Sequence, residues 1–332
     1  MINIGDIDIL KQYMVDKGFA ANLAAVHVEY LGGGVSNIVA GIKCDAGNFV
    51  MKQALAKLKV KAEWLSDVER AHVEKLVLEI LPSIVPGKSP KLVFEDPANF
   101  LFMMESAPEG AVTWKQMLLH GECDTGIALQ AGEFLGEVHA KTRNHVSIAS
   151  TFDERKYFHQ LRIDPFFSYL VLAYPSMRSS INAHIEETWS RRECLVFGDY
   201  SPKNILVYQN SIIPIDFEVA HYGDPSFDIG FLWAHLVLKA VYLSDDRYLE
   251  LLRQTWVGYQ SKTGKSNVEA RSIRQLGFLL LARMDGKSPV EYITSDVQKE
   301  KIRMIGKAII QNKPCEISAV LDLIKEDVRN EN

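Results

Sequence analysis

The stretch Val196-Phe197-Gly198-Asp199-Tyr200-Ser201-Pro202-Lys203-Asn204-Ile205-Leu206-Val207 decides the fold, together with Pro214-Ile215-Asp216-Phe217-Glu218 just downstream. Two apolar runs, 205–208 and 212–217, flank the turn Gln209-Asn210-Ser211 and predict a β-hairpin. Hairpin pairing brings the entry of the hairpin next to its exit. We therefore expect Asp199 and Asn204, at the entry, to lie close to Asp216 and Glu218, at the exit.

These four side chains present oxygen atoms, which are the ligands that a hard cation such as Mg²⁺ prefers. Phosphoryl transfer needs metal ligands, a carboxylate near the acceptor hydroxyl, a cation on the phosphates and a loop over them. Asp199 is predicted to be the carboxylate near the acceptor, with Asn204 and Asp216 as metal ligands. Glu218 is either a further metal ligand or an exposed carboxylate beyond the metal site.

The N-terminal part of the chain is rich in strand patterns and contains a single strong helix pattern after its first residues. The order β-β-β-α-β-β follows from the predicted segments 26–31, 37–43, 49–54, 66–81, 91–95 and 99–104. Ser66 and Glu69 are expected to form a capping box at the start of the helix. Lys52, inside the third strand, can place its ammonium group on nucleotide phosphates. Glu74 in the helix is the preferred partner of Lys52, since Glu69 already has the capping role.

The segment Gly32-Gly33-Gly34-Val35-Ser36-Asn37 joins the first two of these strands. Glycine lets backbone N–H groups approach phosphates closely, although glycines between strands are more often simple turns. The position of the segment, one strand before Lys52, favours a phosphate-binding role for it.

The second part of the chain is mostly helical. It begins after Pro108-Glu109-Gly110, and its helix patterns cover 126–142, 180–191, 228–243, 245–261 and 267–283. We predict an α+β protein with a small β-rich lobe, residues 1–106, and a larger helical lobe, residues 107–332. The expected site lies in a cleft between the lobes.

Composition narrows the function classes. The 332 residues carry a formal net charge of −5, so a duplex nucleic-acid partner is not expected. Four scattered cysteines without a CxxC pair fit a reducing, cytoplasmic location. The start of the chain lacks the basic region of a secretory signal. The apolar stretch 229–243 contains His235 and Lys239 and is expected to be a buried helix rather than a membrane span.

The sequence resembles the protein-kinase-like small-molecule kinases, the family of aminoglycoside phosphotransferases, choline kinases and methylthioribose kinases. The family's catalytic loop reads His-Gly-Asp-x-x-x-x-Asn, and this chain has Phe197-Gly198-Asp199 through Asn204. The resemblance runs from about residue 25 to 245, and more weakly to 285. It implies a two-lobed protein-kinase-like fold that uses ATP and Mg²⁺, with Asp199 as the catalytic base. Phe197, in place of the family's histidine, is the one feature that supports an alternative, a nucleotide-binding pseudokinase that regulates a partner.

The resemblance also implies the nucleotide contacts. Lys52, Glu74, Gly33, Gly34, Ser36 and Asn37 are expected around the phosphates, while the Glu105 carbonyl and the Ala107 amide are expected to meet adenine. Asp228 is expected to support the backbone of the catalytic loop.

The acceptor is a small polar molecule with a hydroxyl group, and a sugar-like acceptor is favoured. Met51-Lys52-Gln53-Ala54-Leu55 and Asp216-Phe217-Glu218 are similar to segments of the methylthioribose kinases. Those enzymes lack an asparagine like Asn204 and use paired arginines near the C-terminal end, where this chain has Arg283 followed by Met284. Aminoglycosides and choline or ethanolamine therefore stay open as acceptors. The cluster Arg283, Asp285 and Lys287 is predicted either to grip a neutral or weakly anionic polyol or to be only a helix terminus.

Overall fold

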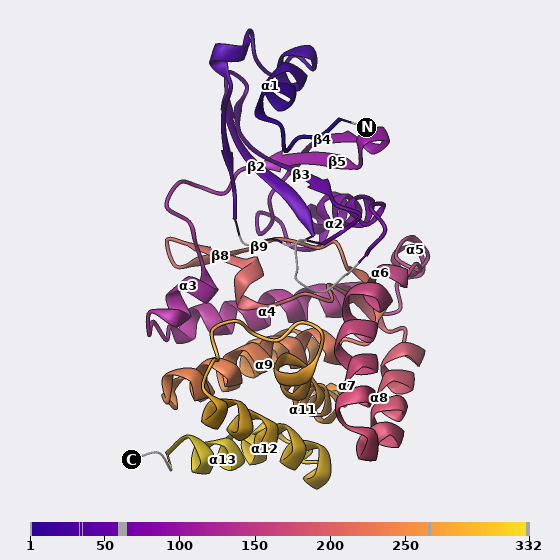
Figure 1. The fold of residues 1–332 in the computed structure, drawn as a ribbon, viewed down its shortest axis with the longest axis vertical. Helices are drawn as coiled ribbons and strands as arrows, with labels where there is room; N and C mark the ends of the chain where they lie inside the picture. Colours follow the sequence, from indigo (N-terminus) through magenta and orange to yellow (C-terminus); the bar gives the residue numbers. More distant parts are fainter. Residues whose placement is uncertain (1, 33, 35, 59–64, 265–266, 330–332) are drawn as a thin grey trace. The chain divides into compact units, whose positions relative to one another are not determined.

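The structure is a computed structural model that describes residues 2–32, 34, 36–58, 65–264 and 267–329. The chain divides into two compact units, Met1–Glu109 and Gly110–Asn332. The first unit is built on a sheet and the second is mostly helical (Figure 1). The predicted α+β class, with a small β-rich part and a larger helical part, is confirmed.

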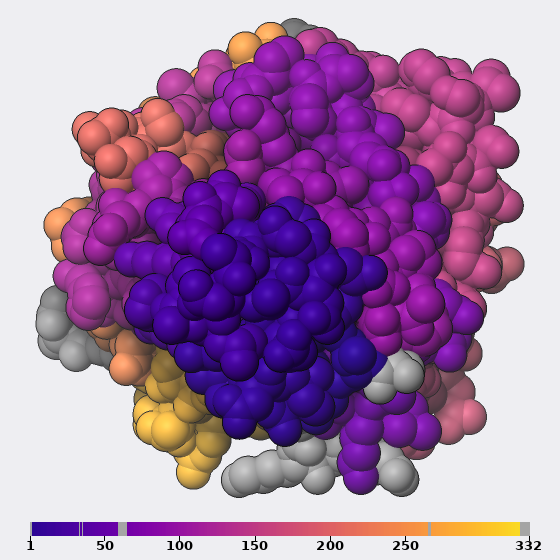
Figure 2. Space-filling model, turned by 90° about the horizontal axis from the view of Figure 1, so that it is seen from above, coloured from indigo at the N-terminus to yellow at the C-terminus, as the bar shows by residue number. Residues whose placement is uncertain are grey.

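The first unit contains one five-stranded antiparallel sheet in the order β1-β2-β3-β5-β4. Its elements are α1 (Ile7–Asp16), β1 (His27–Tyr30), β2 (Asn37–Cys44), β3 (Gly47–Ala54), α2 (Arg70–Ile84), β4 (Leu92–Asp96) and β5 (Leu101–Glu105). Residues of α1 and of one sheet face form an apolar core that includes Leu10, Met14, Ala40 and Met51. The indigo N-terminal residues form one continuous patch in the space-filling view (Figure 2).

The start of α2 differs from the sequence expectation. The helix begins at Arg70 rather than at residue 66, and Glu69 makes no side-chain capping bond, so the predicted capping box is wrong. The buried Arg70 guanidinium explains the difference, because it donates to the carbonyl oxygens of Ser66 (3.2 Å) and Asp67 (2.9 Å). The backbone before the helix is therefore tied to an arginine side chain rather than wound into a first helical turn.

The second unit contains the remaining elements, with two small sheets, β6-β8-β9 and β7-β10, beside its helices. They are β6 (Val112–Thr113), α3 (Trp114–Leu119), α4 (Thr125–Thr142), α5 (Val146–Thr151), α6 (Lys156–Phe158), η3 (His159–Ser168), α7 (Tyr169–Ala173), α8 (Arg178–Ser190), β7 (Cys194–Val196), β8 (Ile205–Tyr208), β9 (Ser211–Pro214), β10 (His221–Gly223), α9 (Ser226–Leu243), α10 (Arg247–Thr263), α11 (Val268–Asp285), α12 (Asp296–Asn312) and α13 (Ile317–Arg329). The predicted hairpin is present as β8 and β9, paired from Ile205–Pro214 to Tyr208–Ser211.

Helix α9 lies at the centre of this unit. Every residue from Ser226 to Val241 is buried. The helix is long and apolar enough to cross a membrane by composition, but 89% of it is buried inside the protein. It is therefore a core helix, as the sequence predicted.

Glycines set the close contact between α4 and α10, namely Gly132 and Gly136 on α4 and Gly258 on α10. A Cβ atom on Gly132 would lie 1.9 Å from the Thr255 carbonyl oxygen, and one on Gly258 would lie 2.2 Å from the Leu129 carbonyl oxygen. Neither backbone oxygen can move without shifting its helix. The two helices approach this closely because these glycine positions lack a side chain.

Gly258→Ala is expected to lower the free energy of unfolding by about 2–3 kcal/mol, because the added methyl group forces the helices apart. Gly126→Ala in the first turn of α4 is the control, since its Cβ would meet only the Asp124 side chain, at 3.1 Å. Denaturant unfolding of both variants measures the difference. An unchanged midpoint for Gly258→Ala would show that the contact between these helices is loose.

Candidate functional site

In the first unit, Lys52 and Glu74 form a buried ion pair. Lys52 lies in β3 and Glu74 in α2, and their Nζ and Oε1 atoms are 2.8 Å apart. The side chains are 5% and 1% exposed. A buried charge is stable only beside an opposite charge, so burial favours the orientation in which the Lys52 ammonium group contacts Glu74. The structure thus places beside Lys52 the glutamate that the sequence favoured.

Arg70 connects the backbone segments around this pair. Besides its bonds before α2, it donates to the carbonyl oxygens of Ser36 and of Leu55, the latter at 2.9 Å. Ser36 and Asn37 are buried where β2 begins, and Asn37 Nδ2 donates to Ser36 Oγ at 3.2 Å. Gly34 is exposed, whereas Gly33 and Val35 lie outside the described residues. The predicted phosphate loop therefore joins a segment that a buried arginine holds in place.

The segment after β5 carries the residues expected to meet adenine. The Glu105 amide is used within the sheet region, where it donates to the Lys91 carbonyl oxygen at 2.9 Å. The Ala107 amide donates to no residue in the described part of the chain. This arrangement is compatible with the nucleotide contact that the resemblance implied for Ala107.

In the second unit, Asp228 holds the loop that leads to Asp199. Its two carboxylate oxygens accept 2.7 Å hydrogen bonds from the amides of Phe197 and Gly198. His139 Nε2 lies 3.4 Å from the same carboxylate and its Nδ1 lies 3.1 Å from the Tyr259 hydroxyl. The supporting role expected for Asp228 is confirmed by these bonds.

Asp199 follows directly and is surrounded by donors. Its carboxylate oxygens lie 2.7 Å from Arg162 Nη2 and 3.0 Å from Lys203 Nζ. Asn204 Nδ2 donates to Asp199 Oδ2 at 2.8 Å and to its carbonyl oxygen at 3.0 Å. Asp199 is 6% exposed, so these contacts fix one orientation of its carboxylate. The structure brings Asp199 and Asn204 together as the sequence predicted.

The oxygen atoms around Asn204 suit a hard cation. Because Nδ2 faces Asp199, the amide oxygen of Asn204 is directed to a different side and accepts no hydrogen bond within the described residues. The Asn204 carbonyl oxygen accepts from the Ile215 amide at 2.9 Å, which brings the next residue, Asp216, close to Asn204. Asp216 has φ +69°, a left-handed conformation that is rare for residues other than glycine. Strained backbone of this kind concentrates at functional sites.

Glu218 lies two residues further on and is buried. In the described part of the chain no group of three or more His, Cys, Asp and Glu side chains is arranged to hold a metal ion. A cation here would accordingly be held by few protein oxygens, those of Asn204 and Asp216 first, with the rest of its shell from the nucleotide. This donor set fits Mg²⁺, which keeps phosphate oxygens and water among its ligands.

Phe197 packs beneath this loop in place of the family's histidine. It is 1% exposed, and its ring centroid lies 4.9 Å from that of Phe217 and 6.0 Å from that of Phe134. The aromatic ring therefore supports the residue between Asp216 and Glu218 by packing alone.

The three residues at the end of α11 have different partners. Asp285 accepts from Arg303 Nη2 (2.6 Å), Arg303 Nε (2.9 Å) and the Tyr174 hydroxyl. Burial raises the pKa of Asp285, but the bonds from Arg303 and Tyr174 outweigh burial and the pKa is lowered. Arg283 instead donates to Ser288, and the Lys287 amide donates to Pro165. Arg283 and Asp285 lie two apart on α11 and do not share a face, so the structure does not bring these two side chains together as one grip.

Sequence reasoning missed Arg162 and did not assign a role to Lys239. Arg162 lies in η3, which is wound as a π-helix, and its Nε donates to the Gly198 carbonyl oxygen at 2.6 Å. No motif surrounds it. Lys239 is 1% exposed in the middle of α9, and its Nζ donates to the His235 carbonyl oxygen at 3.0 Å. A lysine inside an apolar run was the available signal.

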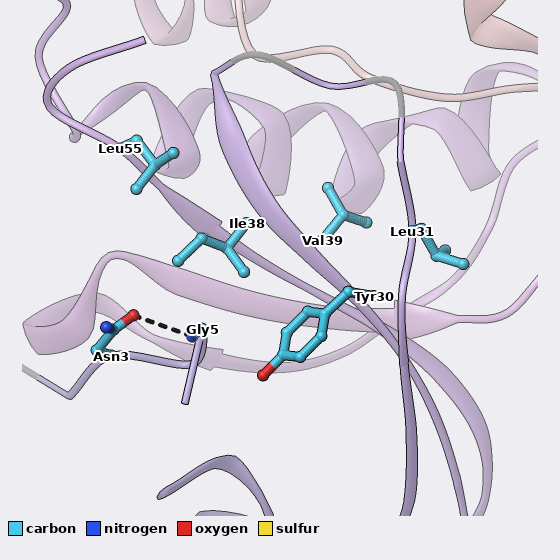
Figure 3. A pocket seen from close by; sticks show the side chains of 7 residues that line it. All are labelled: Asn3, Gly5, Tyr30, Leu31, Ile38, Val39 and Leu55. Carbon is cyan, nitrogen blue, oxygen red and sulfur yellow. Dashed lines mark hydrogen bonds between the residues drawn. The ribbon is translucent and has the colours of Figure 1, made fainter. Parts of the chain in front are cut away.

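A pocket of about 330 Å³ in the first unit is a separate feature (Figure 3). Its lining is mainly apolar, with Ile38, Val39 and Leu55 on one side and Tyr30 on another. The Tyr30 hydroxyl is engaged with the Ile4 carbonyl oxygen at 2.7 Å. The lining contains no charged side chain, and none of the predicted site residues belongs to it.

Comparisons with known proteins agree on one class. Residues 109–261 match the phosphotransferase enzyme family. A methylthioribose kinase of Bacillus mycoides (strain KBAB4) is 27% identical over 277 residues, which cover 74% of this chain and 70% of the relative. A choline kinase from Cryptosporidium parvum Iowa II has a TM-score of 0.56 at 14% identity, covering 98% of this chain and 95% of that one. An amicoumacin kinase solved with AMP-PNP and Ca²⁺ has a TM-score of 0.57 at 13% identity, covering 92% and 94%.

The family match and the kinase-named relatives together support a small-molecule phosphotransferase, and its α+β fold matches protein-kinase-like neighbours. The predicted resemblance to this family is confirmed by the match over residues 109–261 and by the kinase-named relatives. Asp199, Asn204, Asp216 and Glu218 all fall within the matched residues.

Stability should depend on pH through Lys239. Burial, followed by the charges of Lys115 and Arg283, lowers the pKa of Lys239 from 10.5 to about 7. Between pH 7 and 10.5 the unfolded chain then binds more protons than the folded chain, so this residue makes stability rise with pH across that window. Below pH 7 the full cost of burying the charge is present.

Lys239→Met removes this cost and keeps most of the side-chain volume. The variant is expected to be more stable than the wild type at pH 6, by an amount on the order of a few kcal/mol, and to lose this advantage as pH rises toward 10. Unfolding by urea at several pH values gives both profiles. Parallel profiles would mean that Lys239 keeps an ordinary pKa in the folded protein.

Proposed function

We propose that this phosphotransferase uses ATP and Mg²⁺ to phosphorylate a hydroxyl group of a small, sugar-like acceptor. The observation that carries the proposal is the arrangement around Asp199: a buried carboxylate on an anchored loop, bonded to Asn204, with Asp216 following the hairpin that starts beside it. The similarity to a methylthioribose kinase over 74% of the chain supports a sugar-like acceptor.

The first unit contributes the nucleotide contacts in this proposal. Lys52, oriented by Glu74, carries the positive charge for the α- and β-phosphates. Gly33, Gly34, Ser36 and Asn37 form the phosphate loop, and the Glu105 carbonyl and Ala107 amide bind adenine. An aligned, desolvated lysine stabilises the charge on the phosphates without reorganising during the reaction.

The second unit contributes the chemistry on the acceptor. The acceptor oxygen forms a bond to the γ-phosphorus while the bond from that phosphorus to the ADP oxygen breaks. The hydroxyl proton passes to Asp199, which acts as general base. Arg162 and Lys203 position the Asp199 carboxylate from two sides.

Asn204 and Asp216, with Glu218 as a further ligand, would hold Mg²⁺, and the ion would supply positive charge against the negative charge that develops on the phosphates. The chain's own part is to present these oxygens in a fixed arrangement. The left-handed backbone of Asp216 and the bond from Ile215 to Asn204 do this.

Asp199→Asn is expected to lower kcat by roughly 10²- to 10⁴-fold, the scale of lost general base catalysis. The KM for ATP should change little, because Asp199 faces the acceptor side. Phosphate transfer to a panel of sugars, amino-alcohols and aminoglycosides measures both constants. Retained turnover in the variant would remove Asp199 from its assigned role.

MgATP is expected to raise the melting temperature of the wild type, since it binds the folded chain preferentially. Asp216→Ala should abolish the part of this shift that depends on Mg²⁺ and leave the shift by ATP alone. Thermal unfolding with ATP, with and without Mg²⁺, separates the two parts. A wild type with no shift at millimolar MgATP would contradict the proposed use of ATP.

A further inference from the structure

Cationic side chains gather in pairs around two aromatic rings of the second unit. The guanidinium carbons of Arg162 and Arg283 each lie 5.6 Å from the centroid of the Phe166 ring. The ammonium groups of Lys115 and Lys239 lie 6.0 Å and 5.6 Å from the centroid of the Tyr292 ring. These residues come from α3, η3, α9 and α11, so four separate elements bring positive charge to one region.

The two pairs form one electrostatic cluster, which lies next to Asp199. The positive charges of Lys115 and Arg283 lower the pKa of Lys239. The lysine pair, Lys115 and Lys239, therefore interacts electrostatically with Arg283 of the arginine pair. Burial lowers the pKa of Arg283 to about 10, and the charges of Asp199 and Arg162 act on the same group. Arg162 also contacts Asp199 directly, at 2.7 Å.

The cluster has too few negative charges of its own. Asp199 is already paired with Arg162 and Lys203. Within the described residues, no carboxylate lies at ion-pair distance from Lys115, Lys239 or Arg283. Glu291, the other carboxylate that acts on Arg283, has an exposed side chain.

Two buried polar atoms in the cluster also lack partners. Arg283 Nε and the Tyr292 hydroxyl are buried and make no hydrogen bond in the described part of the chain. Leaving such groups without a partner is unfavourable, more so when they are charged, so native proteins usually satisfy them. An anion would both balance the positive charge of the cluster and accept hydrogen bonds from Arg283 Nε and the Tyr292 hydroxyl.

We infer that Lys239 and Arg283, with Lys115 beside them, bind an anionic group of the acceptor, a carboxylate or a phosphate. The inference rests on the proposed function and names the substrate class: an alcohol that carries a negative charge and presents its hydroxyl to Asp199. Arg162 links the anion site to the catalytic carboxylate through its contact with Asp199. Cationic acceptors such as choline are disfavoured, because they would enter a field of like charge.

Direct binding to the full-length chain tests this inference. D-ribose, D-ribonate and D-ribose 5-phosphate are titrated by calorimetry in the presence of saturating MgAMP-PNP, and choline is the cationic probe. The anions are expected to bind at least tenfold more tightly than ribose, the scale of one charge-assisted hydrogen bond. The carboxylate and phosphate arms show which anion the site prefers.

Lys239→Met and Arg283→Gln should remove this preference and leave the weak binding of ribose. Lys307→Met is the matched control. Lys307 Nζ lies 5.5 Å from the Tyr174 ring centroid, close to the 5.6 Å between Lys239 Nζ and the Tyr292 centroid, but Lys307 belongs to α12 near Asp285. Its anion affinity should equal that of the wild type. Melting temperatures confirm that each variant is folded.

The preference for anions over ribose should also weaken as pH rises from 6 to 8. The pKa of Lys239 is about 7, so the lysine loses its positive charge across this range. The charged and titratable groups that face Lys239 are Lys115, Arg283, His235 and Tyr292. The pH dependence should vanish in Lys239→Met, which assigns it to the lysine.

Equal affinity for ribose, ribonate and ribose 5-phosphate, preferential binding of choline, or an anion preference that survives both substitutions would each overturn the inference. A failure of the proposed function appears differently. If the proposed function is wrong, the protein will neither bind MgAMP-PNP nor transfer phosphate. The relative affinities for the anions and for ribose would still show whether the cationic cluster binds an anion.

Discussion

The arrangement of the second unit depends on one buried carboxylate, that of Asp228. It is fully buried, and its oxygens are taken up by the amides of Phe197 and Gly198 and by His139. Burying a charge without such donors would be prohibitive. The loop backbone is consequently held where these amides point, with Gly198 in the left-handed region at φ +71°. Asp199, the next residue, takes its position from this anchor.

What could be predicted from the sequence was governed by local rules. Strand alternation and one apolar helical stripe predicted the order of strands and helix in the first unit. The pairing expected of a hairpin predicted that Asn204 lies near Asp216. The choice of Glu74 as the neighbour of Lys52 also followed from local reasoning, although it excluded Glu69 for a capping role that Glu69 does not have. Glu74 was therefore predicted correctly as the partner of Lys52, although part of the reasoning was the wrong assignment of Glu69 to a capping box.

The contacts that escaped prediction are tertiary. Arg70 replaces a capping box by reaching backbone carbonyls on three segments. Arg162 contacts Asp199 from a π-helical segment that contains Pro165. This segment has neither a regular hydrophobic period nor a sequence motif that would have predicted the contact. The expected grouping of Arg283 with Asp285 failed for a geometric reason, since positions two apart on a helix point in different directions. Asp285 is instead occupied by Arg303, which lies on the following helix.

Helix α9 carries both the Asp228 anchor and the buried Lys239. Its first turn carries Asp228, which anchors the loop of Asp199, and Lys239 lies eleven residues later, roughly 16 Å along the axis. Because the helix is buried over nearly its whole length, the anchor and the lysine cannot move independently. A protein that needed α9 only as a core element would gain stability from an apolar residue at position 239, since a buried cation without a carboxylate partner is costly. Retaining a lysine there makes physical sense if the energy lost in folding is recovered when an anionic acceptor binds.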